Sequence, residues 1–418
     1  KLSGFFGAVC KLVWSMQLAA ATSEITVTLT SACSYGTLSV FNRIAEPSMN
    51  LIRSAAIALM AMAAFSSGWP ALNSSRLVAQ TTEPSPYALA LPANESNGHK
   101  IVLLAGDEEY RSEESLPMLG KILSQRHGFD CTVLFSLSAD KSYIDPNNQS
   151  GIGGLEALDD ADLLIVATRF RRPTAEQAKH VQKFIEAGKP VIGLRTATHA
   201  FTGQGNFGNG ISYDQFGRKI LGEQWVNHHG GHKVQGTRSI PAGSPDRPVL
   251  KGIEAVFGPS DVYGVIHLTE ADDVVLLGQV TESLHPESKI VQGGKNEVLQ
   301  PLAWFHEYET GKGTKGRAFC TTAGASVDFV DDDLRRLVVN AAYELLDLPV
   351  PDKADVRFVD AFYPTFYGFI QDPNFWKSQN RQPSDFALGK TPSMQDPPGS
   401  PQWPFRPTPD QDSDAIAK

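Results

Sequence analysis

The clearest chemical signal in the sequence is a short apolar run that ends in polar residues. Residues 190–194 are expected to form a buried strand, and Arg195, Thr196 and His199 follow it. In open α/β sheets, ligands lie beyond the carboxyl ends of the strands. The layout at 193–197 is similar to the elbow that presents a nucleophile in α/β hydrolases, but its central residue is Arg195, a permanent cation. The pattern favours a site that binds a polar or anionic group over one that performs acyl transfer through a Ser or Cys.

Two further apolar runs, 101–105 and 162–167, also end in charged clusters. If the sheet is parallel, all three clusters share one edge, where carboxylates, guanidinium groups and an imidazole could bind sugar hydroxyls and move protons. The alternative is a solvated loop edge with internal salt bridges. We assign acid–base catalysis to Glu108, Glu109 and His199. We assign substrate binding to Asp107, Tyr110, Arg111, Arg169, Arg195 and Thr196.

A third feature is the histidine-rich stretch 225–232, Trp-Val-Asn-His-His-Gly-Gly-His. We predict that His228 takes part in acid–base catalysis. Neutral imidazoles also bind metals, so His228, His229 and His232 form a candidate site for a divalent metal, the one cofactor the sequence suggests. The two glycines disfavour a regular helix and His-Glu-x-x-His is absent, so sugar contacts and an ordinary loop stay open as alternatives.

Two smaller motifs complete the candidate site. Asp261 and Tyr263 open a strand-like stretch at 261–268, and Thr322 closes another at 317–322. Small hydroxyl residues and glycines at a strand end let the backbone approach a ligand. We therefore expect all three residues to contact the substrate, with simple turn chemistry as the alternative.

The order of apolar and amphipathic segments predicts an α/β fold. Continuous apolar strands alternate with helices expected at 115–127, 174–187 and 331–346, which implies a parallel sheet covered on both faces. Further strands are expected at 131–135, 274–280 and 302–305.

Segments outside this core have different compositions. Residues 1–48 are a doubtful N-terminal extension, and 49–80 are similar to a signal peptide, with Arg53 before an apolar run too short to span a bilayer. Residues 81–98 form a linker, 99–350 the main domain and 351–418 a Pro-rich tail, whose aromatic stretch 362–369 we expect to clasp the domain. We therefore expect a periplasmic or secreted protein with no stable membrane span after signal cleavage.

Composition limits the partners. The 41% hydrophobic content is typical of a globular protein, and the net charge of −9 argues against nucleic acid and anionic membranes. This composition favours a small-molecule ligand, and the strand-end clusters make a carbohydrate the expected partner. Cys131 and Cys320 lie in apolar runs and are expected to be buried free thiols, without a cysteine-based metal motif.

Four motifs together resemble the trehalose-utilisation (ThuA-like) family over roughly residues 99–350. They are Ala-Gly-Asp-Glu-Glu-Tyr-Arg at 105–111, Gly-Leu-Arg-Thr-Ala-Thr-His at 193–199, Gln-Trp-Val-Asn-His-His-Gly at 224–230 and Phe-Cys-Thr-Thr-Ala-Gly at 319–324. The resemblance implies a flavodoxin-like, three-layer fold similar to class I glutamine amidotransferases, with a mostly parallel sheet. The amidotransferase nucleophile would fall at Arg195, so that chemistry is not carried over. The resemblance also implies handling of trehalose-like or keto sugars.

The leading hypothesis is an exported protein that binds and transforms a carbohydrate by acid–base chemistry. One alternative is a non-catalytic sugar-binding module on an amidotransferase-like scaffold. The other is a metal-dependent hydrolase.

Overall fold

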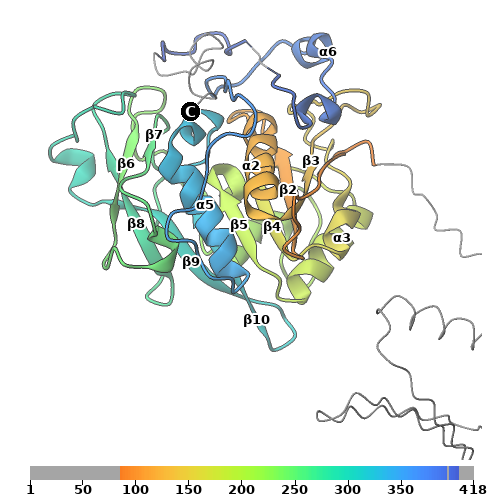
Figure 1. Cartoon of the computed structure of the whole chain (residues 1–418), viewed down its shortest axis with the longest axis horizontal. Coiled ribbons are helices and arrows are strands. Elements are labelled where there is room, and N and C mark those ends of the chain that lie inside the picture. The colour runs from red at the N-terminus through yellow and green to blue at the C-terminus, as the bar shows by residue number, and fades with distance from the viewer. Residues whose placement is uncertain (1–84, 393–394, 404–418) are drawn as a thin grey trace, which may run out of the picture. The chain divides into compact units, whose positions relative to one another are not determined.

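The computed structural model of the protein describes residues 85–392 and 395–403 (Figure 1). The predicted extension at 1–48 and the signal-like segment at 49–80 lie outside the described residues.

One ten-stranded sheet runs through the described domain, in the order β1-β3-β2-β4-β5-β10-β9-β8-β6-β7. The strands are β1 (Ala88–Leu91), β2 (Lys100–Gly106), β3 (Asp130–Leu134), β4 (Leu163–Thr168), β5 (Val191–Leu194), β6 (Thr237–Pro241), β7 (Phe257–Gly258), β8 (Asp273–Val280), β9 (Gln300–Glu309) and β10 (Lys315–Thr321).

Half of the sheet is parallel, as the alternating pattern predicts. Strands β3, β2, β4, β5 and β10 pair in parallel. Among these five strands, the spatial order is 2-1-3-4-5 in chain order, which is the flavodoxin-like arrangement with its switch point between β2 and β4. Helix α2 (Ser112–His127) connects β2 to β3, and helix α3 (Ala175–Glu186) connects β4 to β5.

The other half corrects the prediction of a mostly parallel sheet, because five of the nine strand pairs are antiparallel. Strands β9 and β10 are separated only by residues 310–314. A parallel connection needs a dozen or more residues, so this pair must form a hairpin. The predicted strand at 261–268 is also wrong: only Tyr263 forms an isolated bridge, with His228. The predicted linker contains β1, which pairs with β3.

Apolar cores lie on both faces of the sheet, so the domain has three layers. Successive residues of β2 alternate between them, with Leu103 facing one core and Leu104 the other. Helices α2 and α5 (Asp332–Leu345) cover the first face, and Figure 1 shows them side by side in front of the strands. Helix α3 and the short α4 (Phe216–Ile220) cover the second. Cys131 and Cys320 are buried, one in each core, and burial raises the pKa of both thiols.

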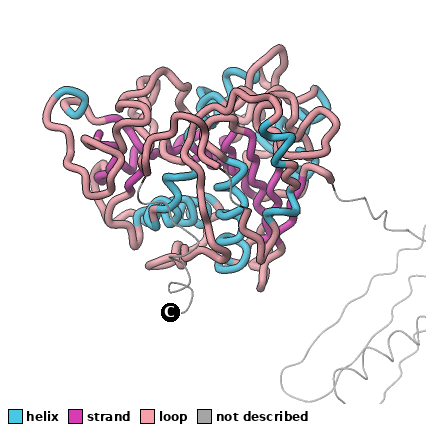
Figure 2. The backbone as a smooth tube through the Cα atoms, turned by 90° about the horizontal axis from the view of Figure 1, so that it is seen from above, coloured by secondary structure: helices cyan, strands magenta, loops and turns pink. Residues whose placement is uncertain are grey.

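The C-terminal segment after α5 returns across the domain as an extended clasp that contains α6 (Phe375–Gln379). The Arg335 guanidinium donates to the Val356 carbonyl at 2.8 Å, and Lys121 of α2 contacts Asp360 at 2.6 Å. Within the stretch 362–369, Phe366 and Tyr367 are buried in a cluster with Tyr110, which confirms the predicted clasp. Figure 2, which views the domain from above, shows long loop segments in front of the strands. Within residues 85–392 and 395–403, no helix is long and apolar enough to cross a membrane.

Candidate functional site

The polar clusters that follow β2, β4 and β5 meet at one edge of the sheet, as predicted. Asp107, directly after β2, accepts a hydrogen bond from the Thr196 hydroxyl of the β5 cluster at 2.7 Å. Its other carboxylate oxygen accepts the backbone N–H groups of Glu109 at 2.7 Å and Tyr110 at 2.9 Å. A single buried carboxylate therefore fixes the β2 loop and ties it to the β5 turn.

Arg195 occupies the elbow after β5 in a left-handed backbone conformation, with φ of 42°. Its buried guanidinium donates to the carbonyl oxygens of Asp261 at 3.0 Å and Thr322 at 2.8 Å, and to the Ser260 hydroxyl at 3.0 Å. These bonds hold the cation inside the protein, beneath the surface of the candidate site.

Two tyrosine rings enclose the same guanidinium. Its central carbon lies 4.1 Å from the Tyr110 ring centroid and 4.4 Å from that of Tyr263. A cation over the face of an aromatic ring is attracted by the ring quadrupole, most strongly where water is excluded. Burial raises the pKa of both phenols, so both rings stay neutral.

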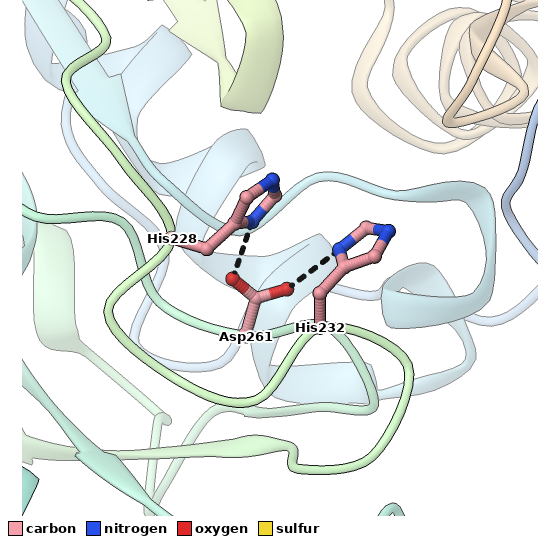
Figure 3. Close-up of side chains that lie close together, drawn as sticks. All are labelled: His228, His232 and Asp261. Atoms are coloured by element: carbon pink, nitrogen blue, oxygen red, sulfur yellow. Dashed lines mark hydrogen bonds and ion pairs between the residues drawn. The ribbon is translucent and has the colours of Figure 1, made fainter.

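Asp261 orients two of the three predicted histidines (Figure 3). Its carboxylate lies 2.7 Å from Nδ1 of His228 and 3.3 Å from Nδ1 of His232, and both rings point toward it from the same loop. Burial alone would raise the pKa of this carboxyl, but the two histidine hydrogen bonds and the Arg195 charge hold it well below its usual range. An ionised carboxylate only accepts hydrogen bonds, so each imidazole carries a proton on Nδ1 and directs Nε2 away from Asp261.

Glu109 lies on the other side of His232. One carboxylate oxygen is 3.4 Å from His232 Nε2, and the other is 3.6 Å from Nε of Arg169. Burial, followed by the nearby Asp107 charge, raises the pKa of Glu109 to about 7. This carboxyl is therefore able to carry a proton near neutral pH.

Glu108 has a different environment, although it is the adjacent residue. Its two carboxylate oxygens contact the guanidinium groups of Arg169 and Arg171, and Arg171 is fully buried. Burial raises the pKa of Glu108, and the two arginine charges oppose that shift. Both oxygens are thus engaged in ion pairs that fasten the β2 loop to the β4 loop.

His199 packs within a group of rings. Its ring centroid lies 4.9 Å from that of Phe170 and 5.5 Å from that of Trp225. Burial and the nearby Arg169 charge lower its pKa well below the usual value. The imidazole is therefore neutral near pH 7, which fits ring packing and hydrogen bonding better than acid catalysis.

Three predicted site residues are placed differently from the rest. His229 points away from Asp261, with Nε2 2.6 Å from the Lys295 carbonyl oxygen. Arg111 donates to the Gly368 carbonyl and lies 5.1 Å from the Trp376 ring, so it anchors the C-terminal segment. Thr322 contributes its carbonyl to Arg195, and its hydroxyl is buried without a hydrogen-bond partner.

The sequence analysis missed two residues of the C-terminal segment that reach the site. The Tyr367 ring lies 5.2 Å from the His232 ring, and the Phe369 ring lies 5.0 Å from the guanidinium carbon of Arg169. The aromatic stretch was visible in the sequence, but its packing position was not.

The metal prediction changes in its membership. His228, His232 and Asp261 each offer a ligand atom, and these atoms lie within 4.8 Å of one another. Two imidazoles and a carboxylate are a donor set that several divalent metals accept. However, Arg195 Nη2 lies 3.4 Å from Asp261 and already contributes a positive charge there. His229 does not belong to the cluster.

Comparisons with known proteins place this chain in a family. The family model described as ThuA, trehalose utilisation, matches residues 102–343, whereas no curated protein matches. A protein described as ThuA-like from Bacteroides uniformis is 15% identical, with 63% of this chain and 95% of that one covered at a TM-score of 0.39. Another from Parabacteroides merdae is also 15% identical, with 65% and 97% covered at a TM-score of 0.38. The family model spans more than half of the sequence, and the chain therefore belongs to the ThuA trehalose-utilisation family.

Proposed function

We propose that this protein binds a carbohydrate and transforms it by proton transfer, with His228 and Glu109 as the proton carriers. Membership of the ThuA family suggests a role related to trehalose utilisation. The observation that carries the proposal is the pair of hydrogen bonds by which Asp261 orients His228 and His232.

His228 is suited to act as a base. The Nδ1–H group of His228 donates a hydrogen bond to Asp261, so the lone pair of Nε2 is available to take a proton. The carboxylate would then stabilise the imidazolium that forms. The side chain is 30% exposed, so a ligand can reach it. Asp261 remains ionised throughout, since its pKa is held low by the histidines and Arg195.

Glu109 is suited to return a proton. Its raised pKa leaves part of the population protonated at neutral pH, and it lies next to His232. On an oxidised sugar, His228 would remove a proton from the carbon next to the carbonyl group. Arg169 would face the resulting enolate oxygen. In an isomerisation, the Glu109 carboxyl would return a proton to carbon. In an elimination, the enolate would expel the glycosidic oxygen and Glu109 would protonate that leaving oxygen; addition of water to the enone would then complete the hydrolysis of a keto-glycoside.

Arg195, Tyr110 and Tyr263 have a positioning role in this proposal. The guanidinium is buried and contacts protein groups on several sides. It therefore orients Asp261 and keeps that carboxyl ionised, instead of contacting the sugar. Arg169, whose side chain is 21% exposed, is the cation that faces the ligand.

The test is hydrogen–deuterium exchange followed by proton NMR. Trehalose oxidised to a ketone in one ring is incubated in D₂O with the protein. The loss of the signal of the proton on the carbon next to the carbonyl is measured. His228→Ala should slow exchange or product formation at least about 100-fold, the scale of general acid–base catalysis. His229→Ala is the matched control, because the neighbouring imidazole points away. Equal rates in all three proteins would refute the assignment. Ligand-induced thermal stabilisation without exchange or product would instead favour the sugar-binding module.

A second candidate function is metal-assisted hydrolysis, favoured by the closeness of His228, His232 and Asp261. Metal content per chain, measured after desalting, tests it. Near-stoichiometric zinc, iron or manganese that falls in His232→Ala would support the metal site, and activity unchanged by chelation would argue against it.

We also propose that the protein is exported, on the basis of the signal-like sequence at 49–80.

A further inference from the structure

Residues 365–369 of the C-terminal segment are fixed to the site by buried polar contacts. The backbone N–H and the hydroxyl of Thr365 donate to the Glu114 carboxylate of α2 at 2.8 and 2.7 Å. The Gly368 N–H donates to the Glu109 carbonyl at 2.7 Å, and the Gly368 carbonyl accepts from Arg111. These contacts hold the segment directly against the loop that carries Glu109.

The tyrosine between these two contacts forms part of the wall. Tyr367 is fully buried, and its ring centroid lies 5.1 Å from that of Tyr110 and 5.2 Å from that of His232. Its hydroxyl accepts the Lys233 N–H at 3.1 Å. The C-terminal segment thus packs against the ring of one of the two histidines that Asp261 orients.

Phe369 differs from the clasp residues around it because its side chain is 42% exposed, whereas Phe366 and Tyr367 are buried. Anchoring the segment does not require this ring, since Thr365 and Gly368 already hold the backbone. The ring lies 5.0 Å from the guanidinium carbon of Arg169. It is therefore presented to solvent beside the cation that faces the proposed ligand.

Phe369 also ends a continuous row of side chains that contact one another through their rings or guanidinium group. Arg169 lies between Phe369 and Phe170, at 5.0 and 4.7 Å, and Phe170 packs on His199, which packs on Trp225. Trp225, at the other end, is 36% exposed. Among the described residues, Phe369 and Trp225 are two of the six exposed large apolar side chains. The row between them passes the proposed proton carriers, because Arg169 contacts Glu109 and Trp225 contacts His228.

We propose that Phe369 is a ligand-binding residue, and that its exposed ring recognises the flat, apolar face of a pyranose ring. The negative face of an aromatic ring attracts the polarised C–H groups that a pyranose displays on that face. An open-chain polyol has no such face. This inference rests on the proposed function, and it assigns ring selectivity to a residue outside the part of the chain that the family model matches.

Calorimetric titration with trehalose, its singly oxidised keto form and sorbitol tests the proposal. Phe369→Ala should weaken binding of the ring sugars roughly tenfold, because one ring contact of about 1.4 kcal/mol is lost. Phe369→Leu, which keeps an apolar side chain but no ring face, should weaken binding similarly. Phe369→Tyr should bind within about threefold of the wild type. Leu388→Ala, at a 40% exposed position farther along the same segment, is the matched control and should bind like the wild type.

The possible outcomes are distinct. Weaker ring-sugar binding in the Ala and Leu variants, with melting temperatures near that of the wild type, supports the proposal. Wild-type binding retained in both variants overturns the role of Phe369 and leaves the proposed function standing. A wild-type protein that binds sorbitol as tightly as the ring sugars overturns the pyranose selectivity alone. A wild-type protein that binds none of the three probes overturns the proposed function, and this inference with it.

Discussion

Replacing Glu109 with Gln should remove a specific pH dependence of stability. Burial raises the pKa of this carboxyl from 4.5 to about 7, so the folded protein holds the proton more tightly than the unfolded chain does. The stability this proton contributes is fully present below pH 4.5 and is lost as the pH rises through 7. A shift of about 2.5 pH units corresponds to about 3 kcal/mol, most of it lost between pH 5 and 8.

Urea unfolding of the wild type and Glu109→Gln at pH 5, 6, 7 and 8 measures this effect. The variant carries a neutral amide at every pH, so its advantage over the wild type should grow by about 2 to 3 kcal/mol across this range. Glu287→Gln, at an exposed position, is the matched control. Carbon NMR of labelled glutamate should also show a carboxyl signal that titrates near pH 7 and is absent from the Gln variant. A stability difference that changes by less than about 1 kcal/mol, together with no such signal, would refute the reasoning.

Three other perturbations test different parts of the structure. Arg195→Leu should lower the free energy of unfolding by about 3 to 5 kcal/mol, because it leaves the buried Asp261 carboxylate without its permanent cation; a loss below about 1 kcal/mol in urea would contradict this. Thr365→Val removes a hydroxyl donor from the buried Glu114 carboxylate. It should cost about 1 to 3 kcal/mol and speed proteolytic cleavage near residues 362–370, and an unchanged cleavage rate would count against the anchor. Residues 49–80 fused to a reporter should carry it out of the bacterial cytoplasm, and a reporter recovered only in the cytoplasmic fraction would remove the export proposal.

The first half of the fold follows from local patterns. Apolar runs at 101–105 and 162–167 are long enough to be buried strands, and they appear as β2 and β4. Thr174 is a recognisable helix N-cap, and its side chain accepts the Gln177 N–H at the start of α3. The second half was misjudged because strand direction depends on connection length. The five residues between β9 and β10 do contain that information, since they are too few for a parallel crossover.

The candidate site was predictable to a similar extent. Strand-end clusters meet wherever parallel strands end together, so the contact between Asp107 and Thr196 follows from topology. Topology does not determine which of two neighbouring residues faces the site. Glu108 contacts two arginines, whereas Glu109 lies between one arginine and His232. His228 faces Asp261, whereas His229 faces away. These differences depend on loop conformation and on packing between segments far apart in the sequence.

The two buried thiols bear on how the described domain responds to its redox surroundings. Cys131 in β3 and Cys320 in β10 are separated by β2, β4 and β5, a span of about 19 Å at about 4.8 Å per strand step. That span is far too wide for a disulfide. Their raised pKa leaves almost no thiolate, the form that oxidants attack. These two thiols are therefore expected to be insensitive to a change from a reducing to an oxidising solvent, and to become reactive only when the sheet itself opens.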